Sequence, residues 1–411
     1  MGAPEVDAAV GGRQHPGSSP LGSRRRSRSA AAERRNAGVD ATIAVARGGG
    51  ASGGGHGDGE VPHFEWSRGL AFGPGGRYVV RKQLGEGTFG RVLGCVDTKT
   101  KEIVAIKVVK GVKRYCRHAE AEAKVLREVL RLDPGRQSRC VELRDTFLHP
   151  RRHFCFVFER LDVSMRDFLK ENGSQGLLVS DVCSIAAQLL QCLAFLHAIG
   201  LTHTDLKCRN VMFRDGRFDE EPLPRSRCPS GEVVKTRRLR SCEVVVIDFG
   251  GALFVDERHT SCIGTRHFRS PEVVLGLPWG EKTDIWSAGC LVAMAYLGVR
   301  PFSMNDDMEH LALMERLLGK EVPKSMIREA VSRGSLTQGI AFDTSCRLEW
   351  PQRAPCDEAI GRVQRTLPLR EQIRAHHRSL LELLEGLLHL HPDKRLAAEA
   401  ALSLPLVAGE V

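Results

Sequence analysis

The sequence predicts an α+β protein that consists of one two-lobed domain and an N-terminal appendage. The chain has 411 residues, which is too long for one small domain. Residues 1–75 are rich in Gly, Ala, Ser and Arg and lack apolar periodicity, which is typical of a disordered tail. From Tyr78 onward, short β-like segments come first, and apolar helix-like runs such as 185–199 and 285–298 follow.

The composition indicates a globular protein and argues against a membrane-spanning one. Hydrophobic residues make up 42% of the chain and charged residues 27%, as in an ordinary globular protein. No run of 18 or more apolar residues exists, so we expect no membrane-spanning helix and no membrane partner. The 13 scattered cysteines indicate reduced thiols in a cytosolic or nuclear protein.

The net charge of +10 is compatible with anionic partners such as ATP, nucleic acid or acidic surfaces, and equally with a basic solvated surface. A short Arg-Ser tract occupies residues 23–29 of the tail. It is compatible either with a solvated basic run or with nuclear targeting and contact with RNA-processing partners.

A glycine-rich turn follows the first β-like segment. Residues 85–92 read GEGTFGRV, and the glycines would let backbone amides approach phosphate groups that a Cβ would exclude. The strand-like segment 91–96 comes next, where a dinucleotide-binding fold would have a helix. The turn is therefore predicted to bind phosphate between two strands. The residues assigned to it are Leu84, Gly85, Glu86, Gly87, Thr88, Phe89, Gly90 and Val92.

Lys107 ends a strand of small and branched residues, where an unpaired ammonium is costly. Glu122 lies fifteen residues further on, in the helix predicted at 119–130, and can reach back to it. Glu120 and Glu128 compete for this role. Glu122 is preferred because apolar residues at helical spacing share its side of the helix.

The stretch 203–210 reads HTDLKCRN and carries the residue types that phosphoryl transfer requires. Asp205 can accept a hydroxyl proton, Lys207 can neutralise a moving phosphate, and Asn210 can hold a magnesium ion. Alone, such a polar loop is more often a solvated turn. Further on, a β-branched strand ends in Asp248, which places a second carboxylate at a turn where it can bind a metal.

Two other segments shape the predicted domain. The apolar strand 153–158 leads into Glu159-Arg160-Leu161, the predicted connection between the lobes. Phe158 would close the rear of a nucleotide pocket, or it is simply a core aromatic. Residues 214–243 interrupt the pattern with prolines and a basic run, and they predict a surface insertion with a hairpin.

Taken in order, these motifs resemble the set found in eukaryotic protein kinases over residues 78–407. The segments that carry the resemblance are 85–92, 104–107, Glu122, 203–210, 248–250, 270–272, 284–289 and Arg395, which could pair with Glu272. The resemblance implies a bilobal kinase fold, with a small mainly β N-lobe and a larger mainly helical C-lobe. The implied boundaries are a tail at 1–75, an N-lobe at about 76–160 and a C-lobe at about 161–407.

Residues 309–319, EHLALMERLLG, are similar to the EHLAMMERILG signature of the LAMMER, or CDC-like, dual-specificity kinases of the CMGC group. They differ by Leu313 for Met and Leu317 for Ile. Read physically, the segment is an amphipathic helix whose better interpretation is packing rather than a functional site.

The resemblance implies ATP and Mg²⁺ as cofactors and assigns roles to the residues above. The adenine would lie between Val92, Ala105 and Met212, with its polar edge on the backbone from Glu159 to Leu161. Lys107, held by Glu122, would orient the phosphates, and Asn210 and Asp248 would bind magnesium. Asp205 would be the catalytic base, with Lys207 and Thr265 in support.

Three departures from the family pattern occur at the site. Thr204 replaces the Arg that gathers a phosphorylated activation loop in many kinases, so we expect a loop that is competent without such a phosphate. Cys208-Arg209 replaces the usual Pro-Glu, and Ser270 replaces Ala.

The expected function is phosphorylation of Ser/Thr hydroxyls on Arg/Ser-rich splicing factors by a nuclear monomer, with the cytoplasm as a second location and tyrosine autophosphorylation left open. No direct nucleic-acid binding is required. The alternatives are another CMGC kinase, a catalytically dead kinase-fold scaffold, and an RNA- or speckle-associated binding protein that works through its tail. A basic substrate calls for an acidic groove, yet this chain is basic.

Overall fold

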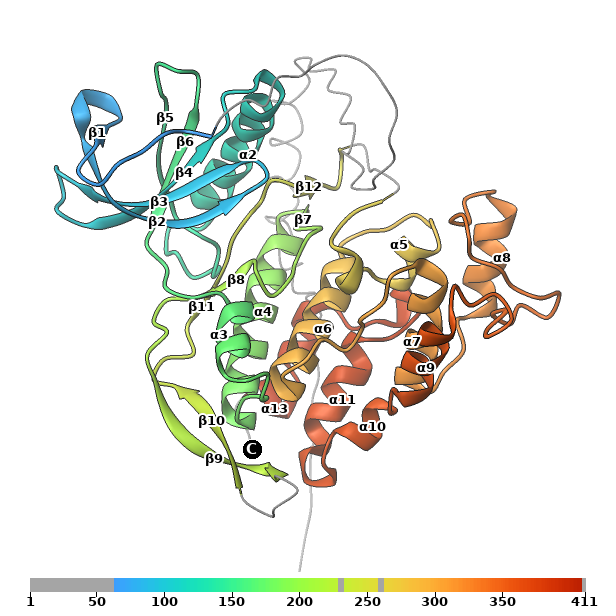
Figure 1. The fold of residues 1–411 in the computed structure, drawn as a ribbon. Coiled ribbons are helices and arrows are strands. Elements are labelled where there is room, and N and C mark those ends of the chain that lie inside the picture. Colours follow the sequence, from blue (N-terminus) through green and yellow to red (C-terminus); the bar gives the residue numbers. More distant parts are fainter. Residues whose placement is uncertain (1–62, 228–232, 258–261, 409–411) are drawn as a thin grey trace, which may run out of the picture. The chain divides into compact units, whose positions relative to one another are not determined.

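The computed structural model describes residues 63–227, 233–257 and 262–408. Its first part is built on a sheet and its second part mainly on helices (Figure 1). The segment Glu159-Arg160-Leu161 leaves the last strand of the sheet and leads into the helical part. The predicted bilobal α+β fold is confirmed.

Within the described residues, the N-lobe sheet has six strands, and every neighbouring pair is antiparallel, in the order β1-β2-β3-β4-β6-β5. Residues on one face of the sheet, such as Leu93, Ile106 and Val157, are completely or almost completely buried. The strands are β1 Ala71–Phe72, β2 Tyr78–Gly87, β3 Gly90–Asp97, β4 Ile103–Val109, β5 Leu143–Leu148 and β6 Phe154–Glu159.

The long helix α2 Lys113–Leu132 packs beside β4, β5 and β6. Its apolar residues recur at helical spacing, and Ala119, Ala123 and Leu126 are buried. Glu122 lies on the same buried side as these residues. The packing of α2 therefore fixes the direction in which this carboxylate points.

The ordered lobe begins earlier than the predicted boundary at residue 76. Phe64 is only 5% exposed and its ring lies 5.5 Å from that of Phe72, while β1 pairs with β2. The assignment of residues 63–75 to a disordered tail is therefore wrong. Aromatic side chains at 64 and 72 supply apolar surface that this lobe buries. The rest of the predicted tail, with the Arg-Ser tract, lies outside the described residues.

The C-lobe is organised around α4 and α6, which pack against each other. The longer α4 is apolar enough to cross a membrane by length and composition, but 56% of that window is buried inside the protein. It is the core helix of this lobe. The helices are α3 Met165–Glu171, α4 Val179–Ala198, α5 Pro271–Val274, α6 Lys282–Leu297, α7 Asp307–Leu318, α8 Lys324–Ser332, α9 Asp357–Arg365, α10 Leu369–Gln372, α11 Arg378–Leu387, α12 Ala398–Leu402 and α13 Pro405–Ala408.

Short strands and 3₁₀ turns frame the helices. Two antiparallel pairs, β7 with β12 and β8 with β11, flank the loop 203–210 and the segment that begins at Asp248. The strands are β7 Leu201–Thr202, β8 Val211–Phe213, β11 Val244–Val246 and β12 Leu253–Phe254. The 3₁₀ turns among the described residues are η1 Pro74–Gly76, η2 Arg266–Phe268, η3 Ala375–His377 and η4 Pro392–Lys394.

The insertion at 214–243 forms the predicted hairpin, from β9 Phe218–Arg227 and β10 Val233–Leu239. The basic residues of β10 and its end meet acidic residues of β9 across the hairpin. The ion pairs are Lys235 with Glu220 at 3.7 Å, Arg238 with Glu221 at 3.0 Å and Arg240 with Asp219 at 2.6 Å. The basic run is therefore matched by carboxylates and is not a free cationic surface.

The signature helix α7 is a packing element, as its apolar pattern predicts. Every residue from Met308 to Met314 is buried, so burial is not confined to one face of the amphipathic helix. Glu309 is completely buried and forms a bidentate ion pair with Arg362 of α9, with N–O distances of 2.6 and 3.0 Å. This pair compensates the one carboxylate that the helix carries into the core.

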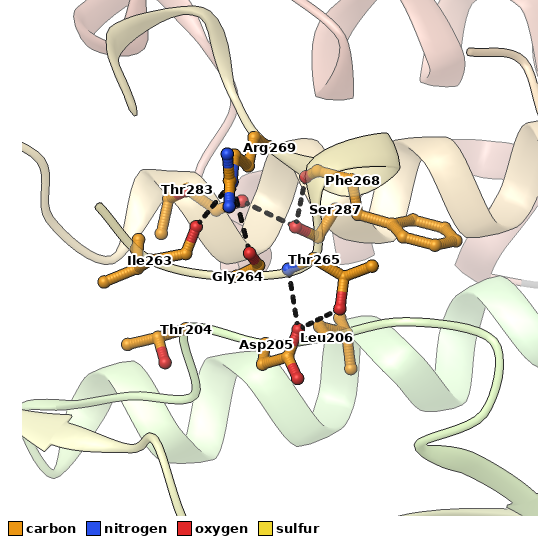
Figure 2. Close-up of a pocket in the computed structure, with 10 residues that line it drawn as sticks. All are labelled: Thr204, Asp205, Leu206, Ile263, Gly264, Thr265, Phe268, Arg269, Thr283 and Ser287. Atoms are coloured by element: carbon orange, nitrogen blue, oxygen red, sulfur yellow. Dashed lines mark hydrogen bonds between the residues drawn. The ribbon is translucent and has the colours of Figure 1, made fainter. Parts of the chain in front are cut away.

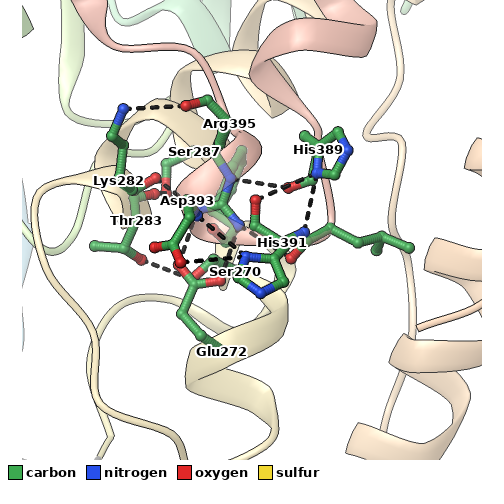
Figure 3. A network of polar contacts seen from close by, with 11 residues as sticks. Ser270, Glu272, Lys282, Thr283, Ser287, His389, His391, Asp393 and Arg395 are labelled. Atoms are coloured by element: carbon green, nitrogen blue, oxygen red, sulfur yellow. Dashed lines mark hydrogen bonds and ion pairs between the residues drawn. The ribbon is translucent and has the colours of Figure 1, made fainter. Parts of the chain in front are cut away.

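The predicted pair of Glu272 and Arg395 is confirmed and lies at the centre of a buried polar network (Figure 3). Each guanidinium nitrogen, Nη1 and Nη2, donates to one carboxylate oxygen at 2.8 Å. The same guanidinium also donates to the backbone carbonyls of Lys282 and His389 at 2.7 and 3.0 Å. It therefore joins the segment 270–272 to the start of α6 and to the last helices.

His310 of α7 gives an expected pH dependence of stability. It is completely buried, and neither ring nitrogen has a hydrogen-bond partner within the described residues. Burial, with the positive charges of His267, Arg269 and Arg266, lowers the pKa of His310 to about 3. The unfolded chain, with a histidine pKa near ~6.5, binds this proton first, so the free energy of unfolding falls as pH drops below 6.5, by up to about 1.4 kcal/mol per pH unit.

Urea unfolding at pH 7.5 and pH 5.5 measures this effect. The wild-type chain should lose more stability between the two pH values than His310→Leu, which has no proton to gain. His376→Leu, at an exposed histidine, serves as the matched control. An equal loss in the wild type and His310→Leu would contradict the assignment.

Candidate active site

The loop 203–210 is held in place by a carboxylate from the C-lobe core. Asp284, buried in the first turn of α6, accepts hydrogen bonds from the backbone N–H of His203 at 2.7 Å and of Thr204 at 2.9 Å. The His203 ring also lies 3.0 Å from the carbonyl oxygen of Ile247. The loop is thereby tied both to α6 and to the strand that precedes Asp248.

Thr204 adopts a conformation that a β-branched residue rarely takes. Its φ of 69° lies in the left-handed region, where the surrounding structure must compensate the strain. Its backbone N–H is bound to Asp284, and its hydroxyl donates to the carbonyl oxygen of Gly251 at 2.8 Å. One side chain thus connects this loop directly to the segment that follows Asp248.

Asp205 is fixed by groups from two segments far apart in sequence (Figure 2). Its Oδ1 accepts hydrogen bonds from both the backbone N–H and the hydroxyl of Thr265, each at 2.8 Å. Its other oxygen contacts the ammonium of Lys207. Three donors therefore determine the position of this carboxylate, which is 27% exposed.

Lys107, Glu122 and Asp248 form a cluster where β4, α2 and the segment that follows β11 meet. The ammonium of Lys107 lies 2.9 Å from both oxygens of Glu122 and 3.6 Å from Asp248. Burial tends to lower the pKa of Lys107, but the two carboxylates outweigh it and raise the pKa. Glu120 and Glu128 make no such contact, since Glu128 pairs with Arg131.

Asp248 and Asn210 present oxygen atoms of the kind that Mg²⁺ prefers. Burial raises the pKa of Asp248, but Lys107, Lys207 and His203 outweigh it and hold the pKa below its usual value. The side chain is 44% exposed, so the ionised carboxylate is accessible. The amide nitrogen of Asn210 donates to the carbonyl oxygen of Asp205 at 2.9 Å, which leaves its own amide oxygen for another partner. The two residues fit a magnesium ion.

An apolar face lies open on the same side of the sheet as Lys107. Ala105 pairs with Phe158 and Val92 with Lys107, and residues directly opposite in a sheet share a face. These apolar side chains and Met212 of β8 are partly exposed, whereas the alternate residues on the other face are buried. Phe158 stacks on Phe156 with 5.6 Å between ring centroids. The flat exposed face fits a planar base.

The glycine-rich turn connects β2 and β3 with the register Gly87 to Gly90. A Cβ at Gly90 would collide with the carbonyl oxygen of Val108, so this position requires glycine for close backbone approach. Apart from their chain neighbours, no atom of the described residues lies within 4 Å of a Cβ placed at Gly85 or Gly87, so the space that those glycines leave is open. At the tip, Phe89 is exposed and its ring meets Tyr115 of α2 edge-on at 5.3 Å.

Contacts connect the predicted catalytic residues in two groups, one around Asp205 with Lys207, Thr265 and Asn210, and one around Lys107 with Glu122 and Asp248. The 159–161 segment lies beside the open face, although the Glu159 carboxylate points away from it, toward Arg214 and the backbone N–H of Glu142.

Two residues that hold the loop in place, Asp284 and Gly251, were assigned no role from the sequence. An acidic residue in the first turn of an otherwise apolar helix was the available signal for Asp284.

The fold and this site together define a protein kinase. The protein kinase domain family matches residues 78–407. A solved crystal structure of a kinase domain superimposes with a TM-score of 0.77 and 31% sequence identity, over 84% of this chain and 98% of that chain.

Similar proteins identify the family of protein kinases to which the chain belongs. Serine/threonine-protein kinase AFC3 of Arabidopsis thaliana is 39% identical over 334 residues, which cover 80% of this chain and 81% of the relative. Dual specificity protein kinase CLK1 of Homo sapiens is 37% identical over 333 residues, which cover 80% of this chain and 65% of the relative. The chain belongs to the LAMMER, or CDC-like, family of the CMGC kinases and is a protein serine/threonine kinase.

Proposed function

We propose that this kinase uses Mg²⁺ and ATP to phosphorylate serine and threonine hydroxyls of Arg/Ser-rich splicing proteins, and so regulates pre-mRNA splicing in the nucleus. The observation that carries the transfer step is the carboxylate of Asp205, which Thr265 and Lys207 hold in one position. Such fixed placement is the main contribution that a protein makes to phosphoryl transfer.

The nucleotide would lie on the open face of the N-lobe. Its adenine would contact Val92, Ala105 and Met212, with Phe158 behind it and the backbone of 159–161 along its polar edge. The glycine-rich turn would cover the phosphates, and Lys107, oriented by Glu122, would bind them. Mg²⁺, held by Asn210 and Asp248, would neutralise phosphate charge.

The acceptor hydroxyl would approach from the side of Thr265. Asp205 would orient it and take its proton, because one of its oxygens is held by Thr265 and the carboxylate remains partly exposed. Lys207 would neutralise charge on the phosphate as it passes from the nucleotide, which leaves as ADP, to the acceptor oxygen. None of these steps forms a covalent bond to the protein.

Activity is proposed to need no phosphate on the segment 248–272. The carbonyl of Gly251, at the start of this segment, is already bound to the loop by the hydroxyl of Thr204. Arg269 closes its other end by donating to the carbonyls of Ile263 and Gly264 at 3.0 and 3.1 Å. These internal contacts would hold the segment in place, as a bound phosphate and an arginine hold it in many kinases.

Two alternatives are less well supported. A catalytically dead scaffold has no reason to retain the complete set of Lys107, Glu122, Asp205, Asn210 and Asp248. The insertion hairpin does not support a nucleic-acid-binding role, because the basic residues of the hairpin are paired with carboxylates. The tail that could carry such a role lies outside the described residues.

Phosphate transfer from Mg-ATP to two peptides tests the substrate class. We expect the full chain to phosphorylate an Arg-Ser repeat peptide in preference to a Pro-directed peptide, measured as kcat/KM. Activity on the Pro-directed peptide alone would retain the kinase and reject the Arg/Ser-rich substrate class.

A further inference from the structure

A segment before the sheet packs on the two strands that carry the glycine-rich turn. It comprises residues 63–72 and is here called the N-terminal strap. Phe64 of the strap belongs to the apolar cluster that contains Leu93 and Ile106. Because side chains alternate along β4, this cluster lies on the face of the sheet opposite to Lys107. The strap is therefore on the side of the sheet away from the proposed nucleotide site.

The strap is itself fixed in place. The ring of Phe64 is buried and meets the rings of His149 and His153 edge-on, with 5.1 and 5.4 Å between centroids. The backbone N–H of Gly69 donates to the carbonyl oxygen of Val80 in β2 at 2.9 Å. Burial of the ring and this backbone hydrogen bond both hold the strap against the lobe. Groups that bind to the strap are therefore restrained with it.

Arg91 of β3 connects the strap with the glycine-rich turn. Its Nη1 donates to the carbonyl oxygen of Phe64 at 3.0 Å, and its Nη2 donates to Oε1 of Glu86 at 3.3 Å. Arg91 lies two residues before Leu93, so both side chains are on the face that the strap covers. Glu86 lies directly opposite Arg91 in the register of β2 and β3. Its carboxylate therefore points toward the strap and away from the nucleotide face.

Two further contacts meet at the carboxylate of Glu86. The Nε2 atom of His63 lies 3.4 Å from Oε1, and the amide nitrogen of Gln83 donates to Oε2 at 3.1 Å. The amide oxygen of Gln83 in turn accepts a hydrogen bond from the indole N–H of Trp66 at 3.0 Å. One exposed ion pair would contribute little. Here the carboxylate has three partners, and each is either part of the strap or bound to it.

The position of Glu86 in the turn makes these contacts consequential. It stands between Gly85 and Gly87, whose backbones have more conformational freedom than those of other residues. Side chains at the two glycines are absent and cannot restrain the turn. The side chain of Glu86 is therefore the group through which this part of the turn can be held from outside.

We propose that His63, Trp66 and Arg91 are positioning residues, which hold the glycine-rich turn through Glu86 at the place where its backbone amides bind the phosphates of ATP. This inference rests on the proposed function and deepens it, since that function has the turn cover the phosphates. A turn that is already held in its bound position loses less conformational freedom when the nucleotide binds. The strap would thus strengthen ATP binding without touching ATP.

Binding of ATP and of adenosine to the full chain, measured by calorimetry with Mg²⁺ present, tests this role without requiring catalysis. Both ligands carry the base, but only ATP has phosphates for the turn to contact. We expect Arg91→Met, which keeps the aliphatic stem, to weaken ATP binding by about three- to tenfold. Adenosine affinity should stay within about twofold of the wild-type value, because the base contacts are unchanged. Trp66→Phe, which keeps a ring but has no N–H donor, should give the same difference at a smaller size.

Two more variants show whether the effect passes through Glu86. Glu86→Gln combined with Arg91→Met should bind ATP about as well as Arg91→Met alone, because both changes remove the same contact. Arg68→Gln, at an exposed arginine of the strap, is the matched control and should change neither affinity.

An unchanged ATP affinity in Arg91→Met would overturn the inference, and so would equal losses of ATP and adenosine affinity, which would indicate general damage to the lobe. The same result alongside phosphate transfer by the wild-type chain would reject the positioning role alone. If the variants weaken only ATP but the wild-type chain transfers phosphate to no peptide and not to itself, the positioning role is supported and the proposed function fails.

Discussion

Asp205→Asn is expected to lower kcat by about 10²- to 10⁴-fold, the usual contribution of a positioned acid or base. The amide can still occupy the position next to Thr265, so the loop should keep its shape. It cannot take the proton of the acceptor hydroxyl. Steady-state phosphate transfer would give kcat, and titration with a fluorescent nucleotide would give ATP affinity, which should stay within about threefold because the Lys107 cluster is untouched.

The matched control for this variant is Asp219→Asn, on the exposed insertion hairpin, which should leave kcat unchanged. A kcat for Asp205→Asn equal to that of the wild type would remove Asp205 from the mechanism. A loss of nucleotide binding together with kcat would instead indicate that the substitution disrupts the whole site.

Arg395→Met is expected to lower the free energy of unfolding by about 3–5 kcal/mol, because it leaves the Glu272 carboxylate buried without a partner. Glu272 is only 1% exposed. Burial raises its pKa, but Arg395 outweighs burial and lowers the pKa below the ordinary value. The stability that this carboxylate contributes is therefore present above its unfolded pKa, and it is lost as pH falls through the lower folded pKa.

Urea denaturation at pH 7.5 measures this loss. The double variant Glu272→Met/Arg395→Met should recover much of the stability, because no charge is left buried. Arg378→Met serves as the control, since Arg378 pairs with Glu382 at a similar distance but on the surface. That change should cost less than about 1 kcal/mol. Equal losses at Arg395 and Arg378 would show that the buried network does not stabilise the C-lobe.

Much of the site could be predicted from the sequence because its residues occur in short motifs with fixed spacing. Asp205, Lys207 and Asn210 share one loop, and the helical phase of Glu122 selected it over its two neighbours. The pair of Glu272 and Arg395 spans 123 residues, and only the resemblance to protein kinases brought them together.

Other features depend on the fold and could not be predicted. The role of Asp284 depends on two backbone N–H groups whose direction only the folded loop determines. Residues 63–75 look like a tail by composition, yet Phe64 and Phe72 find a buried place against the sheet.

A single-turnover reaction with labelled Mg-ATP and a serine peptide tests most directly whether this site transfers phosphate. We predict label on the peptide serine with the wild-type chain and almost none with Asp205→Asn at equal nucleotide occupancy. Nucleotide binding without label on any peptide or on the chain itself would contradict the account and indicate a kinase-fold scaffold.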